Sequence, residues 1–208
     1  MAEPIFEGAK GRQLRFDFLP DWRAVKFDNS AWYRDDIKSH VKAMDVLASD
    51  GTAHWWIEVK DCKGFETDNL PRLSPADPPE AEAARAWVAN EGYAGAVAVR
   101  RGKPFVVDEV AEKLEGTLVG VTAAARSAAT HVSAATLAPF AKVTNGSAPW
   151  SVVLLLTWRP EARDFGRLAM RLRDKLCQRL AAYKVQCFVL NETESAPEQP
   201  WTLTRVNK

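Results

Sequence analysis

The stretch KAMDVLASDGTAHWWIEVKDCKG, Lys42 to Gly64, contains the clearest local signal in this sequence. Hydrophobic residues alternate with other residues on both sides of Asp50-Gly51, a dipeptide typical of a tight hairpin turn. The pattern therefore predicts two antiparallel strands, Lys42 to Ser49 and His54 to Lys60, which are joined by this turn.

A two-residue turn at the centre of the hairpin fixes which residues lie opposite one another. With Asp50-Gly51 as that turn, Met44 faces Ile57 and Val46 faces Trp55. These pairs are apolar, and successive side chains of a strand point to opposite faces of the sheet. One face of the hairpin is therefore expected to pack into a hydrophobic core.

The opposite face of the hairpin carries charged residues. Asp45 is expected opposite Trp56, with Glu58 as its diagonal neighbour and Lys60 two residues further along the same side. Diagonal partners lie about 7 Å apart at the backbone, which allows two carboxylates to share one ion. The spacing therefore predicts a metal site formed by Asp45 and Glu58.

A small number of oxygen ligands suits Mg²⁺ or Mn²⁺, which retain water molecules and bridge protein carboxylates to a substrate phosphate. A lysine beside such an ion orients the attacking water or stabilises charge on the phosphoryl oxygens. Asp45, Glu58 and Lys60 are thus the predicted catalytic residues of a metal-assisted phosphodiester hydrolysis.

The tripeptide acid-x-Lys is weak evidence by itself. It occurs at Asp36-Lys38, Glu58-Lys60 and Asp61-Lys63. Only Glu58-Lys60 combines it with an alternating strand and an acid across a turn. On an exposed sheet face such a pair is usually solvated and contributes at most about 1 kcal/mol. The alternative is a catalytically silent module that binds nucleic acid or a partner protein.

Hydrophobic periodicity outside the hairpin predicts further elements. The helices are Glu3 to Phe18, Glu80 to Asn90, Asp108 to Ala129 and Glu161 to Ala182, and the strands are Ala24 to Asp28, Trp150 to Trp158 and Val185 to Leu190. The run WSVVLLLTW is typical of a strand buried on both faces. This order predicts an α/β fold with a mixed β-sheet flanked by helices, in which Val152 to Leu190 forms a parallel β-α-β unit.

The length of 208 residues suits one domain. A proline-rich loop, Thr67 to Pro79, leaves the sheet and opens a small insertion over about residues 66–105. Within this insertion, Ala94 to Val99 and Pro104 to Val107 suit either short strands or connecting segments.

The composition is that of a soluble protein, with a formal charge of +1 and 47% hydrophobic residues. No apolar run is long enough to span a bilayer and Met1 to Gly11 lacks a secretory pattern, so a cytoplasmic protein without a membrane partner is expected. The three cysteines have no metal-binding spacing and are expected to be reduced thiols. No glycine-rich phosphate loop is present.

The segment Lys42 to Gly64 resembles the PD-(D/E)xK nuclease superfamily, which includes restriction enzymes, Holliday-junction resolvases and many defence and mobile-element nucleases. By this resemblance Asp45 is the first acid, Glu58 the second acid and Lys60 the motif lysine, while Met44 stands where the name-giving proline would be. The resemblance implies a restriction-endonuclease-like core of a helix, three strands, a helix and a strand. It also implies DNA as the substrate and Mg²⁺ or Mn²⁺ as the cofactor.

Two accessory residues follow from the same resemblance. Many relatives carry an acid in the first helix, for which Glu7 is the candidate, and some carry a Gln, Lys or Arg on the helix after the motif strand, for which Lys113 is the candidate. Both residue types are equally ordinary at solvated positions.

Basic residues at two places suit contacts with phosphates. They are Arg100, Arg101 and Lys103 in a predicted turn, and Arg163, Arg167 and Arg171 at i+4 spacing on the helix Glu161 to Ala182. Both sets equally suit solvated surfaces. The sequence does not separate DNA from RNA, and a homodimer would let two sites cut two strands.

Overall fold

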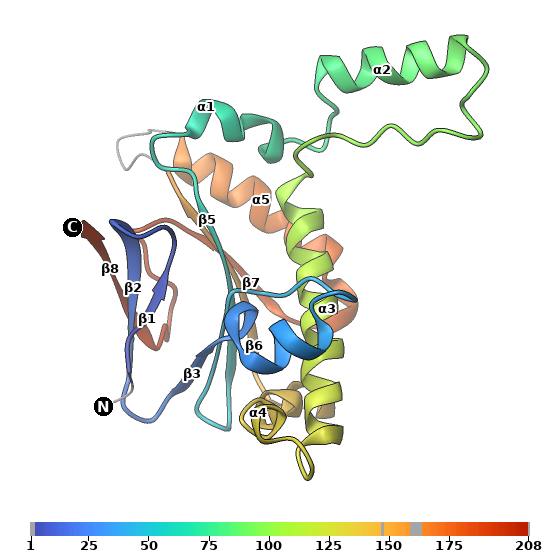
Figure 1. Cartoon of the computed structure of the whole chain (residues 1–208). Helices are drawn as coiled ribbons and strands as arrows, with labels where there is room; N and C mark the ends of the chain where they lie inside the picture. Colours follow the sequence, from blue (N-terminus) through green and yellow to red (C-terminus); the bar gives the residue numbers. More distant parts are fainter. Residues whose placement is uncertain (1–2, 147, 159–163, 208) are drawn as a thin grey trace.

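The computed structural model describes residues 3–146, 148–158 and 164–207. Its elements stack in layers, with helices on one face of a central β-sheet and a smaller β-sheet on the other face (Figure 1). The architecture is α/β with mixed sheets flanked by helices, as predicted from the alternation of strand and helix patterns.

The central sheet has five strands in the order β3-β4-β5-β6-β7. Their bounds are β3 Arg23–Lys26, β4 Val46–Ser49, β5 His54–Asp61, β6 Trp150–Thr157 and β7 Gln186–Leu190. The first three strands pair antiparallel, whereas β5-β6 and β6-β7 pair parallel. Every residue of β6 is buried, in agreement with the predicted strand covered on both faces.

The second sheet is antiparallel, in the order β1-β2-β8, with bounds β1 Ile5–Glu7, β2 Arg12–Phe18 and β8 Trp201–Asn207. The predicted helix Glu3 to Phe18 is therefore wrong. Leu14, Phe16 and Phe18 are buried at every second position, which is the period of a strand. Gly8 and Gly11 have positive φ in the turn between β1 and β2.

The helices are α1 Glu66–Asn69, α2 Pro79–Asn90, α3 Val106–Ser127, α4 Val132–Ala135 and α5 Phe165–Arg179. Shorter helical turns are η1 Phe27–Asn29, η2 Tyr33–Ile37, η3 Leu70–Leu73, η4 Ala138–Asn145 and η5 Ala181–Tyr183. The helices predicted at Glu80 to Asn90 and Asp108 to Ala129 are confirmed as α2 and α3. The one predicted at Glu161 to Ala182 is shorter, and residues 161–163 lie outside the described part.

The two faces of the central sheet have separate hydrophobic cores. Alternate residues of β5 and β6, such as Trp56 and Leu154, pack with α3 and α5, while Trp55, Ile57 and Val153 pack against the second sheet. Burying one such side chain contributes about 1.5–3 kcal/mol. The helix-facing side of β5 is thus covered by protein at Trp56 and Glu58, whereas Lys60 toward the end of the strand is partly exposed. Within the described residues, no helix combines the length and apolar content needed to cross a membrane.

The hairpin forms, but its register differs from the prediction by two residues. Val46 pairs with Ile57 and Ser49 with His54, instead of Trp55 and Thr52. The turn is longer because the Asp50 carboxylate accepts hydrogen bonds from the N–H groups of Thr52 and Ala53. Since side chains alternate with period two, this shift leaves each residue of β5 on its expected face.

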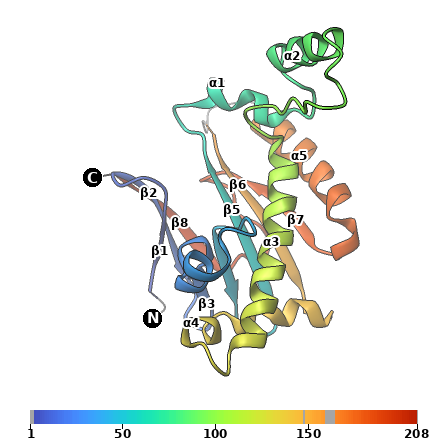
Figure 2. The same cartoon turned by 45° about the vertical axis from the view of Figure 1, so that its right-hand side comes forward.

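Residues 66–105 connect β5 to α3 and add no strand to the sheet. Neither Ala94 to Val99 nor Pro104 to Val107 forms a strand. α2 stands away from the rest of the molecule in both views (Figures 1 and 2), and Trp87 is 61% exposed on it.

α3 lies unusually close to the chain that leads into β4. A Cβ atom on Gly116 would overlap the carbonyl oxygen of Lys42, and one on Gly120 would press on Ile37 and Phe27. One residue beyond Gly116, the Thr117 hydroxyl accepts a hydrogen bond from Met44 N at 2.8 Å. The glycine therefore allows the helix to approach the segment that carries Asp45.

We expect Gly116→Ala to lower the free energy of unfolding by about 1–3 kcal/mol, because the backbone must shift to admit the methyl group. This loss outweighs the gain of up to about 1 kcal/mol that alanine brings to a helix interior. Urea unfolding measures the change. Gly166→Ala in α5, where a Cβ meets nothing within 4 Å, is the matched control and should leave stability unchanged or raised. Equal stability of Gly116→Ala and wild type would contradict the close approach.

Candidate active site

Four charged side chains from three parts of the chain meet beneath α3. Asp45 lies just before β4, Glu58 and Lys60 lie on the helix-facing side of β5, and Lys113 comes from α3. The structure thus brings together the two predicted metal ligands, the motif lysine and one predicted accessory residue.

The carboxylates and amines are in direct contact. Lys113 Nζ donates to Glu58 Oε1 at 2.6 Å and to Asp45 Oδ1 at 3.3 Å. Lys60 Nζ donates to the same Glu58 oxygen at 2.5 Å. A single oxygen of Glu58 therefore accepts two ammonium groups, and one of these ammonium groups also bridges to Asp45.

The backbone of the hairpin orients Asp45. Its N–H donates to Ile57 O at 3.2 Å, and its Oδ2 accepts the N–H of Val59 at 2.7 Å. The side-chain carboxylate thus takes the place of a backbone acceptor where the β4-β5 ladder ends at Val46. This arrangement leaves Oδ1 directed at Lys113.

Glu58 is the most deeply buried of these groups, with 0% of its surface exposed. Burial, followed by the neighbouring charge of Asp45, raises the pKa of Glu58 to about 7, against the opposing effect of both lysines. Its second oxygen, Oε2, is buried and has no hydrogen-bond partner among the described residues. A buried carboxylate with a free oxygen is able to accept a ligand.

Lys113 is held in its charged form. Burial would lower its pKa, but the carboxylates of Glu58 and Asp45 outweigh this effect and raise the pKa of Lys113. The ammonium group therefore acts as a cation shared by the two acids.

Two further residues extend the charged cluster, and neither was identified from sequence. Glu109 Oε1 accepts a hydrogen bond from Lys60 at 2.8 Å, and Glu109 Oε2 accepts one from Arg72 of η3 at 2.9 Å. Burial would raise the pKa of Glu109, but Lys60 and Arg72 lower it overall. A sequence signal for Glu109 exists, because it precedes Lys113 by four residues and thus shares its helix face.

The predicted accessory acid Glu7 lies in β1 and not in a first helix, and it pairs with Lys26 at 2.6 Å. Asp28 of η1 is the acid that lies near Asp45, and the sequence did not predict it as a site residue. Burial, followed by the charges of Asp45 and Glu7, raises the pKa of Asp28 to about 6.

The basic residues proposed to contact phosphates have mixed placements. Arg101 donates to Ser74 O at 3.0 Å and also to Pro71 O, Lys103 donates to Asp68 O at 2.5 Å, and Arg171 donates to Leu73 O at 3.2 Å. These three therefore hold the α1-η3 segment. Arg100 lines a hollow beside α2, Arg167 is exposed on α5, and Arg163 lies outside the described residues.

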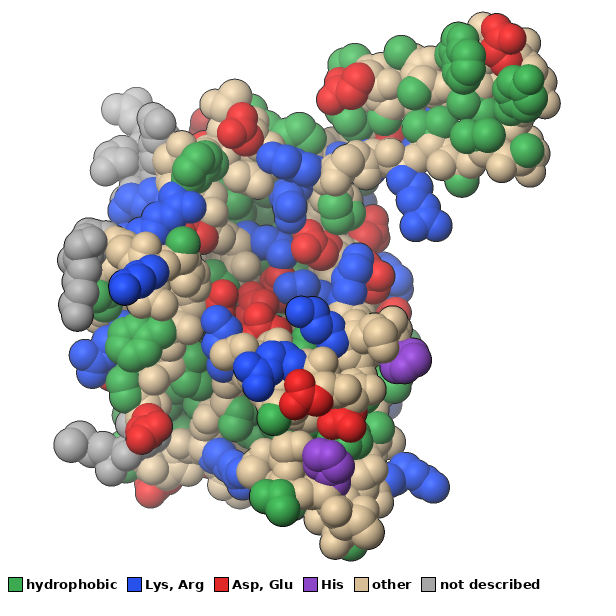
Figure 3. Space-filling view, in the orientation of Figure 1, with side chains coloured by type: hydrophobic (Ala, Val, Ile, Leu, Met, Phe, Trp, Pro, Cys, Tyr) green, Lys and Arg blue, Asp and Glu red, His purple; other side chains and the backbone are tan. Residues whose placement is uncertain are grey.

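Figure 3 shows one face of the molecule, in the orientation of Figure 1. Acidic side chains gather at its centre, and Lys and Arg side chains surround them on several sides. Positive charge gathered in this way on a surface favours the approach of anionic ligands.

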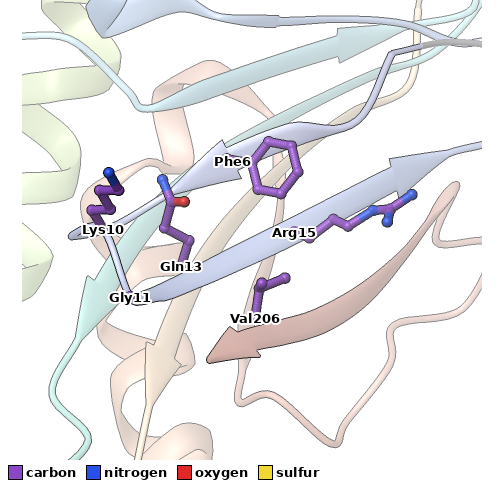
Figure 4. Close-up of a pocket in the computed structure, with 6 residues that line it drawn as sticks. All are labelled: Phe6, Lys10, Gly11, Gln13, Arg15 and Val206. Atoms are coloured by element: carbon purple, nitrogen blue, oxygen red, sulfur yellow. The ribbon is translucent and has the colours of Figure 1, made fainter. Parts of the chain in front are cut away.

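A hollow lies elsewhere, on the outer face of the second sheet (Figure 4). It has a volume of about 640 Å³ and is lined by Phe6, Lys10, Gly11, Gln13, Arg15 and Val206. The carboxylates described above take no part in it, so hollow and site are distinct.

The type of donor atom at the site suits a divalent ion, whereas the number of protein ligands is small. Asp45 and Glu58 supply hard oxygen atoms, and the position between them already holds a cationic group, Lys113 Nζ. Within the described ranges, no set of three or more His, Cys, Asp or Glu side chains is placed to hold a metal ion. An ion bound here would therefore depend on two carboxylates, with water and phosphate oxygens completing its shell.

Comparison with known proteins gave no match to this chain among protein-family models, curated proteins or solved structures. The function is therefore argued from the geometry and chemistry of the site.

The raised pKa of Glu58 predicts a pH-dependent stability. Between its ordinary value of 4.5 and about 7, the folded protein holds a proton that the unfolded chain releases, so stability falls as pH rises through this window. Glu58→Gln does not titrate. Each pKa unit corresponds to about 1.4 kcal/mol. Between about pH 4.5 and about pH 8, wild type should therefore lose a few kcal/mol of unfolding free energy relative to Glu58→Gln.

Urea unfolding of both proteins at several pH values measures this difference. Glu112→Gln, at an exposed position of α3, is the control and should follow wild type. Parallel stability curves for wild type and Glu58→Gln would show that the carboxyl has an ordinary pKa.

Proposed function

We propose that the protein is a metal-dependent nuclease that hydrolyses phosphodiester bonds of DNA, with a site of the PD-(D/E)xK type. The observation that carries the proposal is the convergence of Asp45, Glu58 and Lys60 on one buried point, with Glu58 Oε2 left without a partner among the described residues. Keeping two carboxylates together in a protein interior is costly, and pairing with the lysines leaves Glu58 Oε2 unused among the described residues, which a bound ion would explain.

Each residue has a role in the proposed reaction. Asp45 and Glu58 would hold Mg²⁺ or Mn²⁺, which when bound supplies a Lewis acid for a phosphoryl oxygen and an acidified water. The Lys60 ammonium group would orient the attacking water or stabilise the negative charge that develops on the phosphate. Lys113, which bridges the two acids, would balance their charge while no divalent ion is bound.

The order of elements around the site supports a restriction-endonuclease-like core. Three antiparallel strands, β3, β4 and β5, precede α3, and β6 then pairs parallel to β5. This is the order that the resemblance implies, except that the hairpin β1-β2 stands where a first helix was expected.

The choice of DNA as substrate rests on the same resemblance, and the Lys and Arg side chains around the acidic centre support a polyanion (Figure 3). A homodimer would supply two sites for the two strands of a duplex.

A silent binding module is the second candidate, and one observation favours it. The Lys113 ammonium group contacts both carboxylates, so the acids are already neutralised by a cation from the chain itself. If a divalent ion does not displace this group, the same surface binds nucleic acid without cleaving it.

We expect wild type to cleave plasmid or single-stranded DNA with Mn²⁺, and Lys60→Ala to cleave about 10²-fold more slowly or less while binding DNA equally. Because the Lys60 ammonium group pairs with the buried Glu58 and with Glu109, the thermal midpoint of the variant is measured alongside to show that it is folded. Lys63→Ala is a matched control, because Lys63 also follows an acid-x pattern but pairs with Glu192. If wild type binds nucleic acid yet cleaves neither DNA nor RNA, the binding module replaces the enzyme.

We also expect Mn²⁺ to bind wild type weakly and Asp45→Ala at least tenfold more weakly, because one of two carboxylate ligands is lost. Isothermal titration calorimetry measures both affinities. Glu112→Gln removes an exposed acid outside the site and should bind Mn²⁺ like wild type. Equal affinity of Asp45→Ala and wild type would contradict the ligand assignment.

A further inference from the structure

Lys60 is held at both sides by carboxylates. Its amine donates to Glu58 Oε1 at 2.5 Å and to Glu109 Oε1 at 2.8 Å. Glu58 is one of the two proposed metal ligands, so its negative charge is shared with any ion that binds there. Glu109 is not a proposed metal ligand, so its contact with the amine does not depend on the metal.

Glu109 is itself fixed by a second cation. Its other oxygen accepts a hydrogen bond from Arg72 Nη1 at 2.9 Å, and its side chain is only 13% exposed. Charge-assisted hydrogen bonds at both oxygens leave the carboxylate little freedom to rotate. A continuous chain of contacts therefore runs from Arg72 through Glu109 to Lys60.

Arg72 belongs to η3, inside the insertion between β5 and α3, so its position depends on how that segment is attached. Arg171 of α5 attaches this segment to the body of the protein by donating to Leu73 O, while Arg101 and Lys103, near the end of the insertion itself, donate to backbone carbonyls between Asp68 and Ser74. The insertion is thus anchored to the body of the protein at the point from which Arg72 reaches α3.

From these contacts we infer that Glu109 and Arg72 are positioning residues for Lys60, which makes the insertion a structural part of the site. This inference rests on the proposed nuclease function for its effect on turnover. Neither residue contacts Asp45 or Glu58 through a described hydrogen bond, so neither is assigned a catalytic role.

The activity test separates positioning from DNA binding and from stability. Glu109→Gln and Arg72→Met should each lower kcat about 10- to 100-fold, the range for residues that orient a catalytic group, while KM for DNA and the thermal midpoint change little. Arg72→Lys should recover part of the loss because it keeps a cation beside Glu109. Since both residues act through one contact, the double variant should lose no more than the stronger single variant. Glu112→Gln, one turn from Glu109 on the exposed side, is the control.

A second test does not depend on activity. Acylation of lysine side chains by an amine-reactive reagent at one pH, read by mass spectrometry, reports how far each amine is released from its carboxylate partners, because a paired ammonium group is blocked and does not react. Lys60 should react at least threefold faster in Glu109→Gln and in Arg72→Met than in wild type, whereas the exposed Lys42 should react equally in all three.

The outcomes distinguish the two proposals. If labelling of Lys60 rises in both variants but wild type cleaves no nucleic acid, the positioning contacts stand and the nuclease function fails. Unchanged labelling of Lys60 would overturn the positioning inference, whatever the activity. A fall in kcat accompanied by a raised KM and a lower thermal midpoint would assign Glu109 and Arg72 to general stability and also overturn it.

Discussion

The carboxylate of Glu58 lies in the protein interior, and a charge there must be matched by cations. Lys60 supplies one from the same strand, but the second comes from α3 as Lys113, so the helix has to pack with that side chain over β5. Gly116 permits this packing, because any larger residue would keep α3 away from Lys42. Strand, helix and the segment before β4 are therefore tied together by one buried charge.

Sequence was sufficient to find the face on which the charges meet, although it gave the wrong pairing. Alternate residues of a strand lie on the same face, so a register shift of two residues leaves every residue on its expected face. Glu58 and Lys60 therefore lie on the face to which Asp45 also points. A shift of one residue would have turned them toward the second sheet. The helix α3 was also predictable, because its hydrophobic residues recur over more than twenty positions.

The rest of the structure depends on contacts between distant parts of the chain. β1, β2 and β8 form one sheet although β8 follows β2 by more than 180 residues, and the helix predicted for Glu3 to Phe18 was wrong because a strand period was read as a helix period. Arg72 and Glu109 lie 37 positions apart, and no local pattern links them. Contacts between such distant residues depend on how whole segments pack together. The spacing of hydrophobic residues within one segment gives no information about that packing.

The insertion divides into two parts that differ in how they are attached. The segment from Asp68 to Ser74 is fixed by side chains from α5 and from residues 101–103, whereas α2 stands apart with Trp87 in solvent. α2 buries only Ala81 and Val88 and pairs Arg85 with the neighbouring Asp77, so we expect its amide hydrogens to exchange through local opening, whereas those of the fully buried β6 should require a much larger unfolding. Fast exchange in α2 would thus be compatible with a rigid site, because the attached segment that carries Arg72 separates α2 from Lys60 along the chain.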